Sequence, residues 1–313
     1  MSNNLNSGFG AVSAHSVGNN NGPVGKTFHI AKTGSNAWNY ISALYPTFDN
    51  EGVQRVYACD GTADEVQIQA AIDACKGGTN AYIFVYPGAY TLAAVVTLSG
   101  KSSVHLVAVN GGNVEVGTSG AASLQQGGSA AVLALESYAE VTGFQFINKA
   151  GYPAITMATG KWRPNVHHNY FHVTQGTACN IIEGAGTGFS HGSISNNRFQ
   201  TWVGGAMTSY INISGSNSVL VEKNLIINHS GTVDYGILMG SGVQNVALDN
   251  VITDCGSAGT ITVGIDLGGA TGNTAVGNRI ATLSGRGVAG GTANRSFVDN
   301  RDSTSGGATP IET

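Results

Sequence analysis

The chain has 313 residues, only 10% of which are charged, and its formal net charge is −4. Soluble domains usually contain about 25% charged residues, and glycine is abundant here with 46 residues. The weak negative charge predicts no nucleic-acid partner, and no run of about 20 apolar residues predicts a membrane span. This composition favours repeated short strands with polar, uncharged turns over a helix-rich enzyme.

Residues 1–25 are rich in Asn, Gly and Ser without a period, which predicts a flexible N-terminal arm. The first residues have neither the basic nor the apolar segment of an export signal, so no Sec-type leader is expected. No CxxC pair occurs, and the cysteines are expected to be reduced and mostly buried. These cysteines are Cys59, Cys75, Cys179 and Cys255.

Residues 26–80 are predicted to form an N-terminal cap and attachment region. Residues 27–30 and 55–58 are strand-like, and apolar residues at helical spacing predict a helix over residues 63–76. Gly77 follows as a natural stop.

The start of this helix has a capping signature. Thr62 and Glu65 have the spacing of a capping box, in which the hydroxyl and the carboxylate each satisfy a backbone amide at the helix start. Val66 is expected to extend the apolar face of the helix.

Residues 81–302 are predicted to form one repetitive domain, with an internal repeat from about residue 130 onward. A short segment that contains an asparagine recurs every 22 to 28 residues, and a second apolar strand lies between successive copies. The recurring asparagines are Asn169, Asn197, Asn224, Asn250, Asn278 and Asn300. A period of this size with short strands and no helix is typical of a solenoid.

Stacking explains why such a repeat folds, since one coil cannot bury its own apolar face. Coils stacked about 4.8 Å apart join one apolar residue of each period into an interior column. The predicted column contains Phe171, Phe199, Ile226, Ile252 and Ile280. The asparagines are expected to adopt left-handed turn geometry and to bond the amide of the neighbouring coil as a ladder. Residues 303–313 then form a polar tail.

Residues 60–73 (DGTADEVQIQAAID) and 82–91 (YIFVYPGAYT) resemble the pectate-lyase-like β-helix superfamily. In that family a D-x-x-x-I-Q-x-A-I-D helix caps the solenoid, and a strand ending P-x-G-x-Y begins it. The resemblance implies an all-β, right-handed single-stranded parallel β-helix with a short N-terminal capping helix. It selects no activity, because lyases, hydrolases, epimerases and phage tailspikes share this fold.

Residues 25–30 and 49–58 look like the lead-in of phage and prophage β-helix proteins encoded near capsid genes. This resemblance implies a virion protein, assembled in the host cytoplasm, whose residues 26–61 and N-terminal arm bind the major capsid protein. The candidate attachment residues are Phe9, Phe28, His29, Trp38 and Tyr40.

Enzymes of this fold that cleave polysaccharides need clustered carboxylates. The second strand of each period is expected to present an outward column without an acid pair. The members of this column are Thr156, Glu183 or Ile182, Asn212, Leu238 and Asp266. Lys223 and Asp249 are expected to be neighbours and to form a surface ion pair.

The histidines predict neither a metal site nor an active site. His167, His168 and His172 are close in sequence, but strand alternation and a turn should direct them differently. His191 stands in a Ser-His-Gly segment without the companion motifs of polygalacturonase-type hydrolases. No catalytic residue and no cofactor are therefore predicted.

The leading hypothesis is a capsid decoration or cement protein that projects from the phage head. Virion β-helices of this kind are usually trimers, and Tyr170, Leu225 and Val251 are predicted to form the apolar seam between subunits. The alternative is a receptor-binding tailspike that binds or cleaves host surface polysaccharide. Aromatic residues near turns are the candidates for sugar stacking, namely Trp162, Trp202, Tyr170 and Tyr210. A sugar lyase or epimerase is a third reading, which lacks the necessary acids.

Overall fold

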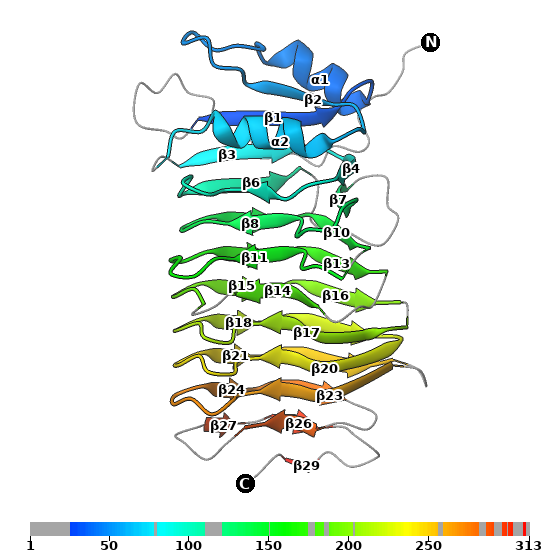
Figure 1. Ribbon diagram of the computed structural model, residues 1–313, viewed down its shortest axis with the longest axis vertical. Coiled ribbons are helices and arrows are strands. Elements are labelled where there is room, and N and C mark those ends of the chain that lie inside the picture. Colours follow the sequence, from blue (N-terminus) through cyan, green and yellow to red (C-terminus); the bar gives the residue numbers. More distant parts are fainter. Residues whose placement is uncertain are drawn as a thin grey trace, which may run out of the picture.

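The computed structural model describes residues 26–77, 80–109, 121–149, 151–174, 179–184, 188–202, 204–255, 259–281, 286–290, 296–298, 300–302 and 309–310. These residues form a long stack of coils (Figure 1), and the fold is a right-handed parallel β-helix, as predicted. Among them the chain forms two helices, α1 (Asn36–Leu44) and α2 (Asp64–Asp73), both at the N-terminal end.

Three parallel sheets form the walls of the stack. In spatial order, the first sheet contains β2 (Val56–Cys59), β1 (Thr27–Lys32), β3 (Ala81–Val85), β6 (Val104–Ala108), β9 (Glu140–Thr142), β12 (Asn165–His167), β15 (Ser193–Ser195), β18 (Leu220–Glu222), β21 (Val246–Leu248), β24 (Thr274–Val276) and β27 (Ser296–Val298). Residues of these strands alternate between the interior and the outer face, as in β6, because successive side chains of a strand point to opposite sides.

The second sheet follows each turn that contains a recurring asparagine. It contains β4 (Gly88–Leu92), β7 (Ala122–Gln126), β10 (Gln145–Asn148), β13 (Tyr170–Val173), β16 (Arg198–Thr201), β19 (Leu225–Asn228), β22 (Val251–Asp254), β25 (Arg279–Ala281), β28 (Arg301–Asp302) and β29 (Thr309–Pro310). Strand β29 pairs antiparallel with β28, unlike the other pairs.

The third sheet closes each coil. It contains β5 (Val96–Thr97), β8 (Leu133–Leu135), β11 (Ile155–Met157), β14 (Asn180–Gly184), β17 (Ala206–Asn212), β20 (Gly231–Leu238), β23 (Gly259–Asp266) and β26 (Arg286–Ala289). A full coil thus has three strands rather than the two expected from the repeat, since a tight turn divides the asparagine-containing segment into strands of the first and second sheets.

The turn before the ladder asparagines from Asn169 to Asn278 has a left-handed residue. The positive φ angles belong to His168, Asn196, Lys223, Asp249 and Gly277, each one position before the asparagine. The prediction that the ladder asparagines themselves are left-handed was therefore wrong for these turns. Gly adopts this conformation without a steric penalty, and Asn and Asp visit it more readily than most residues.

The ladder asparagines are buried and bond from coil to coil. The Oδ1 atom of Asn197 accepts from the backbone N of Asn169 at 3.0 Å, and the Nδ2 atom of Asn197 donates to Val166 O at 2.9 Å. The same amide-to-Oδ1 bond recurs at each step down to Asn300. The ladder satisfies interior backbone groups that no strand reaches.

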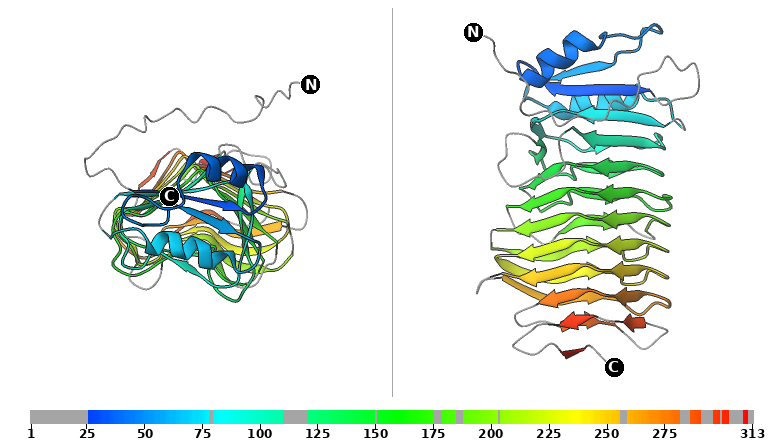
Figure 2. Two further views of the ribbon diagram at one scale, coloured as in Figure 1. Left: turned by 90° about the horizontal axis from the view of Figure 1, so that it is seen from above. Right: turned by 180° about the vertical axis from the view of Figure 1, so that it is seen from behind.

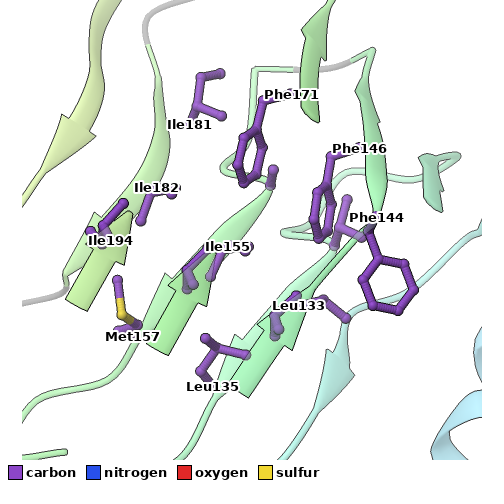
Figure 3. Close-up of a cluster of buried hydrophobic side chains, with 14 of the residues drawn as sticks. Leu133, Leu135, Phe144, Phe146, Ile155, Met157, Phe171, Ile181, Ile182 and Ile194 are labelled. Atoms are coloured by element: carbon purple, nitrogen blue, oxygen red, sulfur yellow. The ribbon is translucent and has the colours of Figure 1, made fainter. Parts of the chain in front are cut away.

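The predicted interior column is confirmed by the strand register. Phe171 stacks on Phe199 with ring centroids 4.6 Å apart, and the column continues through Ile226, Ile252 and Ile280. Phe146 extends it by one coil, 4.8 Å from the ring of Phe171 (Figure 3). Identical apolar positions therefore form one continuous core.

Helix α2 lies across the open end of the first coil (Figure 2, left). The carboxylate of Asp64, fully buried, accepts from Thr91 N and Gly61 N and pairs with Lys32 Nζ at 2.8 Å. Gln69 exchanges two bonds with the backbone of Thr97. Polar side chains of α2 thus satisfy the strand edge that no further coil covers.

The capping-box prediction was wrong. Helix α2 begins at Asp64, its N-cap residue is Ala63, and no side chain caps it. The carboxylate of Glu65 instead accepts from Ala93 N, because this side chain faces the coil edge. Val66, expected on the buried face, is 56% exposed.

Helix α1 packs beside β1 and β2 over a small second core. Its N-cap is Ser35, whose hydroxyl accepts from Trp38 N at 3.0 Å. Ile41 is fully buried there with Val56. Neither helix in the described part of the chain is long and apolar enough to span a membrane.

The cysteines are free thiols, as expected. Cys59, Cys75 and Cys179 are buried, whereas Cys255 is exposed.

Candidate functional site

The main cluster of titratable side chains lies on the outer face of the first sheet, on neighbouring strands β6, β9 and β12. His105 and Glu140 occupy one outward column, because these residues are register partners. Thr142 and His167 occupy the next outward column and are also partners. Parallel pairing thus brings together residues that are 25 to 35 positions apart in the sequence.

Glu140 is the centre of this cluster. Its Oε2 atom lies 2.6 Å from His105 Nδ1, and its Oε1 atom lies 2.6 Å from His167 Nε2. The hydrogen bonds from His105 and His167 lower the pKa of Glu140 to about 2. The carboxylate is therefore ionised at neutral pH, and both imidazoles are oriented by it.

His167 and His168 meet through their Nδ1 atoms, which are 2.8 Å apart. Thr142 Oγ1 lies 3.2 Å from the same atom of His167. Burial, followed by the nearby His167, lowers the pKa of His168. The expectation that these two histidines diverge was wrong, because the left-handed turn at His168 folds its side chain back toward β12.

His172 does point elsewhere, as expected, since it belongs to β13 of the second sheet and stacks with Tyr170. Tyr82 covers one side of the cluster and stacks on His105 with centroids 4.5 Å apart. The Nε2 atom of His105 is buried and lacks a hydrogen-bond partner within the described structure. The face therefore presents an ionised carboxylate, oriented imidazoles and a hydroxyl.

Two exposed tryptophans lie on the turns, each stacked on a histidine of the next coil. Trp162 stacks on His191 at 4.9 Å, and Trp202 stacks on His229 at 4.1 Å. About half of each indole is exposed. The other two aromatic candidates for sugar stacking, Tyr170 and Tyr210, are buried.

The outward column of the third sheet has the predicted members. Thr156 pairs with Glu183, followed by Asn212, Leu238 and Asp266. Ile182 is buried, so Glu183 is the outward residue.

The two acids of this column, Glu183 and Asp266, are three coils apart, roughly 14 Å at the usual strand spacing. In the strands that the structure describes, no two carboxylates are neighbours in one outward column. A retaining or inverting pair of carboxylates needs about 5 to 9.5 Å.

Lys223 and Asp249 occupy successive left-handed turns but do not form the expected ion pair in the described structure. The carboxylate of Asp249 lies instead beside Gly277 of the following turn. No group of three or more His, Cys, Asp or Glu side chains with metal-binding geometry occurs among the described residues.

The predicted attachment residues separate into buried and exposed ones. Phe28 and His29 are buried, because β1 lies between β2 and β3 with both faces covered, so neither can contact a capsid directly. Trp38 is partly buried against the small core, and Tyr40 is exposed. Phe9 lies outside the described residues.

Tyr170 cannot contribute to a subunit seam as predicted, since only 3% of it is exposed. Its hydroxyl donates to Gln200 Oε1 at 2.9 Å, and the guanidinium of Arg198 lies 5.7 Å from its ring centre. Leu225 and Val251 are neighbours in the outward column that continues from Arg198, and both are partly exposed.

No family model and no curated protein match this chain. Two solved structures are similar at low scores. The A-module of the mannuronan C-5 epimerase AlgE6 of Azotobacter vinelandii is 13% identical, with a TM-score of 0.30, and the match covers 78% of this chain and 96% of that chain. ORF18 of Geobacillus virus E2 is 11% identical, with a TM-score of 0.27, covering 89% and 74%. At these scores neither likeness bears on function.

Proposed function

We propose that this protein is a rod-shaped structural protein that projects from a phage particle, as a decoration or cement protein bound to the major capsid protein by its N-terminal end. One observation carries the proposal. At that end Tyr40, Leu44 and Phe48 are 54% to 56% exposed. Large exposed apolar side chains mark contact surfaces. Tyr40 and Leu44 are one helical turn apart on α1, and Phe48 follows the helix, where it forms a β-bridge with Gln54.

The rest of the molecule suits a passive spacer. Its coils bury neutral amide ladders and stacked apolar columns, so its interior contains few charges. The likeness of residues 25–30 and 49–58 to phage lead-in segments supports attachment through the same end. The rod would then point away from the shell.

The copy number of the chain tests this role. Quantitative mass spectrometry of purified particles should find it in numbers of the same order as the major capsid protein. A handful of copies per particle would instead place the protein on the tail and contradict the decoration role.

The apolar end can be tested by substitution. Tyr40→Ser, Leu44→Ser and Phe48→Ser together should abolish binding to particles that lack the protein, measured by co-sedimentation. Tyr152→Ser is the matched control, because Tyr152 is 41% exposed in the body of the rod. Equal binding of both variants would contradict attachment through this end.

A second function, that of a receptor-binding tailspike, is favoured by the two exposed tryptophan–histidine stacks. Flat aromatic faces of this kind can stack on sugar rings. Host surface polysaccharide should then bind the protein, and Trp162→Ala or Trp202→Ala should weaken binding at least tenfold. Release of reducing ends would indicate cleavage of the polysaccharide. If the wild-type protein does not bind the polysaccharide, this role is excluded.

A trimer is proposed with the exposed part of the predicted seam, Leu225 and Val251. Light scattering should give a mass of three chains, and Leu225→Asp with Val251→Asp should give a mass of one chain. A wild-type mass of one chain contradicts the trimer without affecting the attachment proposal.

A further inference from the structure

The pair His167 and His168 has the features of a chelating site rather than of an ordinary surface pair. Glu140 accepts the Nε2 proton of His167, which leaves the lone pair of His167 on Nδ1. Carboxylate–histidine contacts of this kind orient many metal-ligating imidazoles and raise their basicity. In the metal-free protein this lone pair is hydrogen-bonded to His168 Nδ1, and Thr142 Oγ1 lies beside it.

The second imidazole is held in place by the fold. His168 occupies the left-handed position of its turn at φ 54°, and its backbone N donates to Ser195 O at 3.3 Å. The following residue, Asn169, is locked in the buried ladder. His168 is exposed, so solvent reaches the pair. The coil thus fixes the backbone of the pair, and only the imidazole rings must turn when a ligand binds.

The distance between the two nitrogen atoms is short enough for both to bind one ion. Two imidazole nitrogens bound to one metal at about 2.05 Å are about 2.9 Å apart at a 90° angle and about 3.3 Å apart at a tetrahedral angle. In the free protein the two Nδ1 atoms are 2.8 Å apart in a hydrogen bond, and the ring centroids are 5.0 Å apart, so both rings must tilt before their lone pairs converge on one ion. A 90° angle is typical of square-planar or tetragonal Cu²⁺ and Ni²⁺ sites, and imidazole suits both ions.

We infer that His167 Nδ1 and His168 Nδ1 bind one divalent transition-metal ion of the copper or nickel class, with Thr142 Oγ1 beside it and Glu140 as the positioning residue. Metal binding displaces the proton that the two Nδ1 atoms share in the free protein. Water completes the coordination. This inference is independent of the proposed virion role, because it depends only on the outer face of the first sheet.

Neighbouring coils supply substitutions that the fold already accepts. Ser195 is the register partner of His167, and Asn196 occupies the left-handed position equivalent to His168. His167→Ser and His168→Asn should therefore fold normally. His191→Ser is the matched control, because Ser218 occupies the equivalent left-handed position one coil further. All proteins carry Cys255→Ser, which removes the exposed thiol.

The test is a titration of the full chain with Cu²⁺ in the presence of glycine as a weak competitor, followed by electron paramagnetic resonance. The parent protein should bind one equivalent with hyperfine coupling to two nitrogens. His167→Ser or His168→Asn should weaken binding more than tenfold and abolish that coupling. Glu140→Gln should weaken it by about 10- to 100-fold with both nitrogens retained. His191→Ser should bind like the parent.

Two results would overturn the inference. One is binding that is unchanged in His168→Asn, which would place the ion elsewhere. The other is an imidazole N–H···N bond that persists in nitrogen-detected NMR at saturating Cu²⁺ or Ni²⁺, which would show that the pair only shares a proton. Circular dichroism of each variant verifies that loss of binding is not loss of fold.

Discussion

The N-terminal cap and the repeated coils of this protein are stabilised by different interactions. In the cap Lys26, Lys32 and Arg55 form ion pairs with carboxylates of residues 49–64, whereas Lys161–Glu136 is an ion pair in the coils. The coils instead use neutral amide ladders, of which Asn197–Asn224 is a typical step. Within the stack, the backbone groups at the edge of each coil are hydrogen-bonded to an equivalent neighbouring coil. The first coil has no such neighbour on one side, so individual polar side chains must bond its edge.

This difference makes the two regions respond differently to pH and to mutation. Charged and buried titratable groups respond to pH, but amide ladders do not. We therefore expect acid to affect the cap before the coils.

The largest effect is expected for Asp64→Ala in the cap. The substitution leaves Lys32 without its partner and removes the acceptor of two backbone amides, Gly61 N and Thr91 N. Removing one member of a buried pair typically costs about 3–5 kcal/mol. Chemical unfolding should show the loss, and hydrogen exchange should place it in β1, β4 and α2. Uniformly faster exchange along the rod would argue against a separate cap.

Asn224→Ala should have a somewhat smaller effect, centred on the coils. The substitution removes the acceptor of Asn197 N and Nδ2 and the donor to Ile194 O, all buried. Asn197 Nδ2 keeps its bond to Val166 O, so the backbone N of Asn197 is the donor that loses its acceptor. At about 1–3 kcal/mol for such a buried group, and with a smaller loss at the carbonyl of Ile194, a total of roughly 2–4 kcal/mol is expected. Asn217→Ala, at an exposed turn, is the control and should change the unfolding midpoint little. Equal effects of the two would mean that the ladder contributes no net stability.

Acid should destabilise the cap through His29. Its ring is buried between aromatic side chains and stacks on Tyr45 with centroids 3.9 Å apart, and burial lowers its pKa to about 4. The unfolded chain binds the proton first, so stability is complete above about pH 6.5 and falls as the pH decreases toward 4.

The expected loss is roughly 3 kcal/mol at most, measured as the cap unfolding free energy at pH 7 and at pH 4. His29→Phe should remove this part of the pH dependence. A wild-type cap equally stable at both values would contradict the assignment. Protonation of Glu140, whose pKa is about 2, adds a separate loss only as the pH falls below about 4.5.

Lys26→Ala should have the smallest effect, although it lies in the same cap. Lys26 pairs with Glu51, whose side chain is 71% exposed. Exposed ion pairs contribute below about 1 kcal/mol and are screened by salt. A thermal midpoint shift comparable to that of Asp64→Ala would mean that burial does not determine the strength of cap ion pairs.

The proximity of the residues in the candidate cluster could not be predicted from the sequence. His105, Glu140 and His167 come from three different coils, and their separations do not share one spacing because the loops between strands vary in length. The recurring asparagines begin at Asn169, so the sequence assigns no register to His105. Only the strand pairing aligns these residues in neighbouring columns.

Taken alone, the sequence determined the solenoid, its interior column and the positions of the recurring asparagines. The physical reason is that each coil solves the same packing problem, so the same residue types recur at the same positions. Only the tertiary structure determined which side chains of different coils are in contact and which aromatic side chains are buried from solvent. Tyr170 is the example, since its burial depends on Gln200 and Arg198 of the next coil. Outer-face contacts of this kind are not repeated, and so they leave no period in the sequence.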